Sequence, residues 1–109
     1  MTDYIEAVLN EAAIRNGNLD FVNPPAGFFP ADSFGTRSAE NKGQQIRLNA
    51  NGAFVDTDIR QKTSATVSPR ARFGALLQNT FHAKAGDRVR LIRLHERESE
   101  LQHFPVDMK

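Results

Sequence analysis

Residues 68–94 constrain the fold of this chain most, because they predict a helix, a turn and a strand in direct succession. Apolar residues first recur at the spacing of one helix face: Phe73, Leu76, Leu77 and Phe81. Ala85-Gly86-Asp87 then predicts a turn, and the alternation of arginine and apolar residues over 88–94 predicts a strand with at least one buried face. The alternation slips at Leu91-Ile92, so either a β-bulge lies near Ile92 or both faces are buried there.

The N-terminal segment has the pattern of an amphipathic helix. Its apolar residues fit one helical stripe: Tyr4, Ile5, Val8, Leu9, Ala12 and Ala13. Thr2 or Asp3 can cap the start of this helix, and Gly17 ends it. We therefore expect an N-terminal helix within residues 1–17.

Strand signals fill most of the remaining chain, in residues 19–22, 45–48, 53–59 and 101–106. Asn51-Gly52 predicts a hairpin, because both residues of that turn take positive φ. Pro24-Pro25 ends the first strand, and Pro105 suits an edge strand. Residues 32–35 predict a single helical turn, and the polar loop that follows is long enough to be functional.

These elements predict one domain, residues 1–109, that is mostly β with helices (α+β or all-β): the N-terminal helix followed by a partly open antiparallel barrel over 18–109. The 109 residues can bury one core, and the absence of cysteine excludes disulfides and thiolate zinc sites. No apolar run approaches the length of a membrane span. We expect a cytoplasmic protein that does not associate with membranes.

Charge is unevenly distributed along the chain. Residues 37–97 hold twelve lysines and arginines against five acidic residues, whereas residues 1–36 hold five acidic residues and only Arg15. A basic middle segment suits a surface that faces a polyanion such as nucleic acid, because lysine and arginine displace counterions from phosphates. The same segment also fits a solvated face that binds nothing.

Four motifs occur in the order FFPADSFG, GQQIRLNANGAFVDTDI, SPRARFGALLQNTF and HAKAGDRVRLIRL. Over residues 19–106 this order resembles the DNA-binding pseudobarrel shared by plant B-three transcription factors and by recognition domains of type II restriction endonucleases of the EcoRII and BfiI type. The resemblance implies two loops, called the N-arm and the C-arm, that grip the major groove. By position, residues 22–27 form the N-arm and residues 60–72 the C-arm. The N-arm here is short and proline-rich, and the N-terminal helix is an addition to the family pattern.

The resemblance implies sequence-specific binding of double-stranded DNA by a non-catalytic target-recognition domain. We expect it to act as a monomer, without a metal or cofactor, and to be fused to or associated with a nuclease catalytic domain of a restriction-modification system. Arginine pairs with guanine, asparagine and glutamine pair with adenine, and lysine, serine and threonine bind phosphate or single acceptors. The candidate DNA-binding residues are Asn23, Arg37, Ser38, Asn41, Lys42, Arg60, Gln61, Lys62, Thr63, Ser64, Ser68, Arg70 and Arg72.

Two other functions remain open from the sequence. A protein-interaction or ligand-sensing barrel would dock through the apolar N-terminal helix. A magnesium nuclease would use Asp32 and Glu40 to hold the metal and Lys42 to orient the attacking water. The three histidines lack the neighbours of a zinc site or a catalytic triad, so no catalytic residue is expected.

Overall fold

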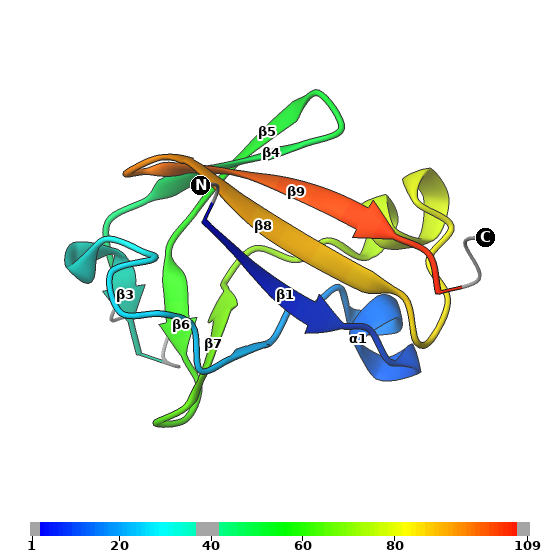
Figure 1. Cartoon of the computed structure of the whole chain (residues 1–109), viewed down its shortest axis with the longest axis horizontal. Coiled ribbons are helices and arrows are strands. Elements are labelled where there is room, and N and C mark those ends of the chain that lie inside the picture. The colour runs from blue at the N-terminus through cyan, green and yellow to red at the C-terminus, as the bar shows by residue number, and fades with distance from the viewer. Residues whose placement is uncertain (1–2, 37–41, 107–109) are drawn as a thin grey trace.

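The computed structural model describes residues 3–36 and 42–106 and shows two mixed β-sheets with a few short helices (Figure 1). This confirms the expected fold class, and the two sheets do not join into a closed barrel. The strands are β1 (Tyr4–Val8), β2 (Phe21–Val22), β3 (Phe34–Gly35), β4 (Ile46–Ala50), β5 (Ala53–Thr57), β6 (Ile59–Gln61), β7 (Thr66–Pro69), β8 (Arg88–His95) and β9 (Glu98–Phe104). The helical elements are α1 (Glu11–Asn16), a 3-10 turn η1 (Ala31–Ser33) and a π-helical segment η2 (Leu76–Thr80). None of these helices is long and apolar enough to cross a membrane.

The five-stranded sheet has the order β1-β8-β9-β4-β5. All of its pairs are antiparallel except β4 with β9. Along β8, Val89 and Leu91 are buried, and Arg88 and Arg90 lie on the opposite face, as the alternation predicted. At the predicted slip, Leu91 and Ile92 pair regularly with β9, so no bulge lies there; Leu91 is buried and Ile92 is half-buried on the other face. The register shift lies further along, between Arg93 and His95.

The four-stranded sheet has the order β2-β7-β6-β3, with β3 parallel to β6 and the other pairs antiparallel. It lies across the five-stranded sheet, and the chain passes repeatedly between the two sheets, for example where β5 leads into β6 (Figure 1). The predicted hairpin turn between β4 and β5 is confirmed, because Asn51 and Gly52 have φ of 52° and 86°. The two sheets enclose one core, whose most deeply buried side chains include Leu19, Phe21, Leu48, Ile59, Leu77, Val89 and Leu91.

The prediction of an N-terminal helix that spans the first segment is wrong for its first half. Residues 4–8 form β1, which pairs with the edge of β8 from Tyr4↔Ile92 to Val8↔Arg88. The helix α1 begins only after Asn10, whose Oδ1 accepts a hydrogen bond from the Ala13 amide at 2.7 Å, and Gly17 ends it with φ of 76°. Pairing with β8 satisfies backbone groups and buries Ile5, and this gain outweighs local helix propensity.

Two further predictions need correction. The helix expected over 73–81 is short, and its Phe81 amide donates to the Leu76 carbonyl at 2.9 Å, which is π-helical spacing. The last strand was expected at an edge, but β9 lies between β8 and β4, and Pro105 follows its end. Proline therefore terminates a central strand here instead of occupying an edge strand.

Gly17 allows α1 to approach the segment before η2. A Cβ at Gly17 would overlap the backbone nitrogen of Gly74 and lie 2.7 Å from that of Phe73, and the φ of 76° already disfavours a side chain. Gly27 has a similar φ of 84°, but a Cβ there would meet nothing within 4 Å. The two glycines form a matched pair for substitution.

We expect Gly27→Ala to lower the free energy of unfolding by about 1–2 kcal/mol, the cost of a left-handed residue with a Cβ. Gly17→Ala should cost about 1–3 kcal/mol more, because overpacking adds to the conformational cost. Urea denaturation of both variants checks this. Equal losses would show that the close approach of Gly17 to Gly74 does not matter.

Candidate nucleic-acid interface

The predicted C-arm is built on the β6–β7 hairpin. Strands β6 and β7 pair from Ile59↔Pro69 to Gln61↔Val67, and residues 62–65 form the tip. The Thr66 carbonyl accepts hydrogen bonds from the amides of Lys62 and Thr63, and Thr63 Oγ1 accepts from the Ala65 and Thr66 amides. The hydroxyl-rich sequence of the tip therefore folds into a closed turn, held by its own side chains.

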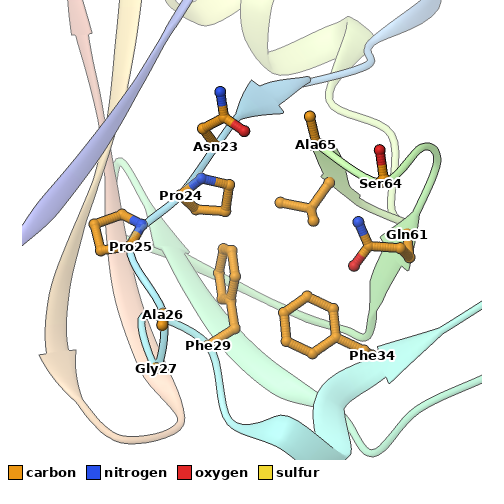
Figure 2. Close-up of a pocket in the computed structure, with 11 residues that line it drawn as sticks. Asn23, Pro24, Pro25, Ala26, Gly27, Phe29, Phe34, Gln61, Ser64 and Ala65 are labelled. Carbon is orange, nitrogen blue, oxygen red and sulfur yellow. The ribbon is translucent and has the colours of Figure 1, made fainter.

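The predicted N-arm lies directly beside this hairpin. Strand β2 pairs with β7, and the Asn23 amide donates to the Ala65 carbonyl at 2.7 Å. Asn23 takes φ of 51°, which asparagine tolerates, and the two prolines that follow carry the chain away from the sheet. The N-arm and the hairpin tip line a common cleft (Figure 2).

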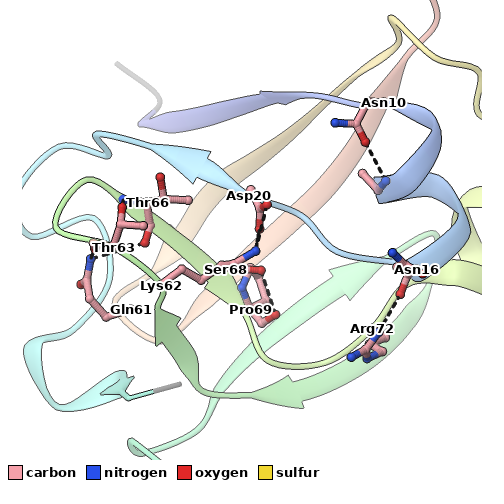
Figure 3. Close-up of polar contacts among 11 residues, drawn as sticks. Asn10, Asn16, Asp20, Gln61, Lys62, Thr63, Thr66, Ser68, Pro69 and Arg72 are labelled. Atoms are coloured by element: carbon pink, nitrogen blue, oxygen red, sulfur yellow. Dashed lines mark hydrogen bonds and ion pairs between the residues drawn. The ribbon is translucent and has the colours of Figure 1, made fainter. Parts of the chain in front are cut away.

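Strand alternation gives the hairpin two chemically different faces. Arg60 pairs with Ser68 on one face, and Gln61 pairs with Val67 on the other. Lys62 continues the face of Arg60, and its Nζ lies 3.1 Å from both carboxylate oxygens of Asp20 (Figure 3). The hairpin therefore has one cationic face and one neutral face.

Arg70 is part of the structural framework. Its Nε and one terminal nitrogen lie 2.7 and 3.0 Å from the two carboxylate oxygens of Asp58, and that nitrogen also donates to the Thr36 carbonyl at 2.7 Å. Asp58 is 4% exposed and also accepts from the Gly43 amide at 2.9 Å. Burial would raise the pKa of Asp58, but the hydrogen bonds from Arg70 and Gly43 hold it below its usual value. Arg70 thus connects β6, β7 and the ends of the polar loop, and its assignment to DNA is corrected accordingly.

The assignment of Ser68 to DNA is also corrected, because its side chain is fully buried and its hydroxyl donates to the Pro69 carbonyl at 3.3 Å. The remaining C-arm candidates are accessible. Arg72 is exposed and makes a 3.3 Å hydrogen bond to the Asn16 carbonyl (Figure 3). Arg60 is half-buried, and its Nε is buried with no hydrogen-bond partner among the described residues. Gln61, Thr63 and Ser64 are exposed at the hairpin.

The other candidates divide between described and undescribed parts of the chain. Asn23 and Lys42 are exposed. Arg37, Ser38 and Asn41 lie outside the described residues. Asp58 fits the open alternative that an arginine of the C-arm pairs with a nearby acid, and the hairpin register places residue 58 beside residue 70. The sequence alone does not indicate Asp20 as the partner of Lys62, or Phe29 and Phe34 as walls of the cleft.

The structure places the residues of the two alternative functions as follows. The apolar stripe of the expected docking helix is divided between β1 and the short α1, so that helix face does not exist. Asp32 lies within η1, and its Oδ1 accepts a hydrogen bond from Arg97 at 2.7 Å. Glu40, the second acid of the proposed metal site, lies outside the described residues.

Comparison with known proteins supports the fold. No protein-family model matches the chain, and no curated protein gives a significant match. Among solved structures, the chain is similar to a hypothetical Arabidopsis thaliana protein, with a TM-score of 0.58 and 9% sequence identity over 100% of this chain and 96% of that one. At this identity the similarity concerns the fold alone.

The two arginines that end the C-arm should differ in their effect on stability. Arg70→Ala leaves the buried Asp58 without its cation, and we expect a loss of about 3 kcal/mol in the free energy of unfolding. Arg72→Ala removes an exposed contact and should change it by less than about 0.5 kcal/mol. Urea denaturation checks both values, and similar effects of the two substitutions would contradict the structural role of Arg70.

Two buried aspartates should make stability depend on acid pH. Burial alone would raise the pKa of Asp87, but hydrogen bonds from the amides of Val106 and Lys84 and from His103 lower it, and the pKa of Asp58 is lowered as well. Because both pKa values lie below the ordinary 3.8, the unfolded protein binds more protons in that range. These two carboxylates should therefore contribute their full stabilisation above about pH 5. The free energy of unfolding should fall as the pH drops through their lowered pKa values.

Urea denaturation at intervals from neutral to acid pH measures this profile. Asp58→Asn should reduce its acid slope, because one of the two carboxylates no longer titrates. An unchanged slope in that variant would contradict the lowered pKa of Asp58.

Proposed function

We propose that this chain is a sequence-specific double-stranded DNA-binding domain that contacts the duplex with the β6–β7 hairpin and the adjacent N-arm. The observation that carries the proposal is the separation of the hairpin into two faces. Arg60 and Lys62 share the cationic face, while Gln61 and Ser64 lie on the neutral side, next to Asn23 of the N-arm. DNA needs both chemistries, since cations hold the phosphates and amides read base edges.

The cations of the C-arm have capacity to exchange their present partners for phosphate. The ion pair of Lys62 with Asp20 is partly exposed, with 24% and 44% of the side chains accessible, and such pairs contribute little stability. The 3.3 Å contact of Arg72 is a single bond to a carbonyl. A phosphate would give Lys62 and Arg72 a stronger, charge-assisted hydrogen bond.

In this proposal Arg60, Lys62 and Arg72 position the backbone, with Thr63 contributing a hydroxyl. Asn23 and Gln61 read base edges. The side-chain amide of Asn23 can make a bidentate pair with adenine, and Gln61, whose Nε2 donates to the Thr63 carbonyl, offers its Oε1 as an acceptor. The sequence resemblance supports a further assignment: the domain is the target-recognition part of a type II restriction endonuclease whose catalytic domain is separate. The similarity in fold to the Arabidopsis protein shows only the architecture on which such arms would be carried.

The triple variant Arg60→Ala/Lys62→Ala/Arg72→Ala tests the proposal. A duplex enriched from a randomised library should bind this variant at least about 10-fold more weakly, and the slope of log affinity against log salt should fall by about 0.9 for each lost phosphate contact. Arg47→Ala is the control, because it removes an exposed arginine from the five-stranded sheet.

Fluorescence anisotropy at several salt concentrations measures the affinities, and thermal melting checks that each variant is folded. Equal affinity of the triple variant and the unmodified protein would refute the proposed interface. An equal loss in Arg47→Ala would show that binding depends on overall charge and not on this surface.

A further inference from the structure

The cleft between the two arms has the size and chemistry of a small ligand site. Its volume is about 280 Å³, which is enough to hold one planar heterocycle. Pro24 and Pro25 of the N-arm form one wall, and Gln61, Ser64 and Ala65 of the hairpin form the facing wall (Figure 2). The cleft is partly open to solvent, so a group on a bound duplex has a route into it.

The floor of the cleft is apolar and aromatic. Phe29 and Phe34 meet edge to face, with ring centroids 6.1 Å apart, and Val67 also lines the cleft. Phe29 is only 3% exposed, so the core fixes its position. Rigid aromatic and proline rings offer surfaces on which a flat ring can pack, and they lose little entropy when it binds.

None of the eleven residues that line the cleft is charged. Arg60 lies on the other face of the hairpin, as the strand register requires, and Lys62, just beyond the end of β6, pairs with Asp20. A phosphate or a carboxylate would therefore enter the cleft without a counter-charge, which is unfavourable away from water. The lining selects a neutral ligand.

Three polar groups at the rim have unused hydrogen-bonding capacity. Gln61 donates through Nε2 to the Thr63 carbonyl at 2.6 Å, and no described residue donates to its Oε1. The side chains of Asn23 and Ser64 likewise have no partner among the described residues. The rim thus offers the Gln61 Oε1 as an acceptor of fixed orientation, the side-chain amide of Asn23 and the hydroxyl of Ser64. Together these groups match the mixed donors and acceptors on the edge of a nucleobase.

We propose that this cleft receives a single nucleobase that is rotated out of the DNA helix when the domain binds. The proposal rests on the DNA-binding function proposed above and extends it. The two faces of the hairpin have different roles in this proposal. Arg60 and Lys62 hold the phosphates beside the extruded nucleotide. The aromatic floor packs on the base, and Gln61 and Asn23 read its edge. Adenine is the best match, because a side-chain amide can accept from N6 and donate to N7.

The direct test uses 2-aminopurine, a fluorescent base whose emission rises when it loses stacking on a neighbour. Because it lacks the N6 amino group that the cleft would read, it is placed in turn beside each adenine of the library-selected duplex, and binding is followed in parallel by anisotropy. We expect a several-fold rise at one position and none at the others. A mismatch opposite the adenine beside that position should strengthen binding, because an unpaired base costs less to extrude.

Two variants connect the signal to the cleft. Ala65→Leu narrows the cleft from the hairpin wall, and Gln61→Ala removes the fixed acceptor from its rim. Each should abolish the fluorescence rise and the mismatch effect and weaken binding of the selected duplex by about 5- to 150-fold, the range that loss of one stacked base implies. Ala53→Leu is the matched control, because it makes the same change at an exposed position of β5, outside both arms.

The outcomes separate the two proposals. Specific binding without a fluorescence rise at any position would overturn base extrusion and leave the DNA-binding function intact. A rise that persists in both cleft variants would place the extruded base elsewhere and overturn the cleft assignment. If the selected duplex binds no better than a scrambled one, both proposals fail.

Discussion

The buried ion pair between Asp58 and Arg70 is the interaction on which the second sheet and its loops depend. Asp58 precedes β6 and Arg70 follows β7, so their bidentate contact closes the base of the hairpin. The same two side chains bind the Thr36 carbonyl and the Gly43 amide, which flank the polar loop. Because a buried carboxylate is costly without its donors, these segments must come together for any of them to be stable.

This pair also decides how the basic residues of the C-arm are used. Arg70 satisfies Asp58 and is withdrawn from the surface, whereas Lys62 and Arg72 make only partly exposed contacts. Alternation along β6 then separates the remaining cations from Gln61. Of the basic residues that the sequence places in this segment, Arg70 holds the hairpin in place, and Lys62 and Arg72 are among those that we propose contact DNA.

Local chemistry explains which parts of the fold were predictable. Gly17, Asn51-Gly52 and Pro24-Pro25 acted as expected, because positive φ and the missing proline N–H are properties of the residues themselves. The helix prediction for the N-terminal segment was wrong because Ile5 and Leu9 fit both a helical stripe and an alternating strand. What decided between the two was the unpaired edge of β8, more than eighty residues away in the chain.

The sequence by itself determined the fold class, most turns, the basic character of the C-arm and the candidate residues, since each follows from residue type and spacing along the chain. Only the tertiary structure decided that Ser68 is buried, that Arg70 is paired, and that the two arms share a cleft floored by Phe29 and Phe34. Burial and pairing depend on groups brought together from distant segments, and a linear pattern does not say which face of a strand meets which neighbour.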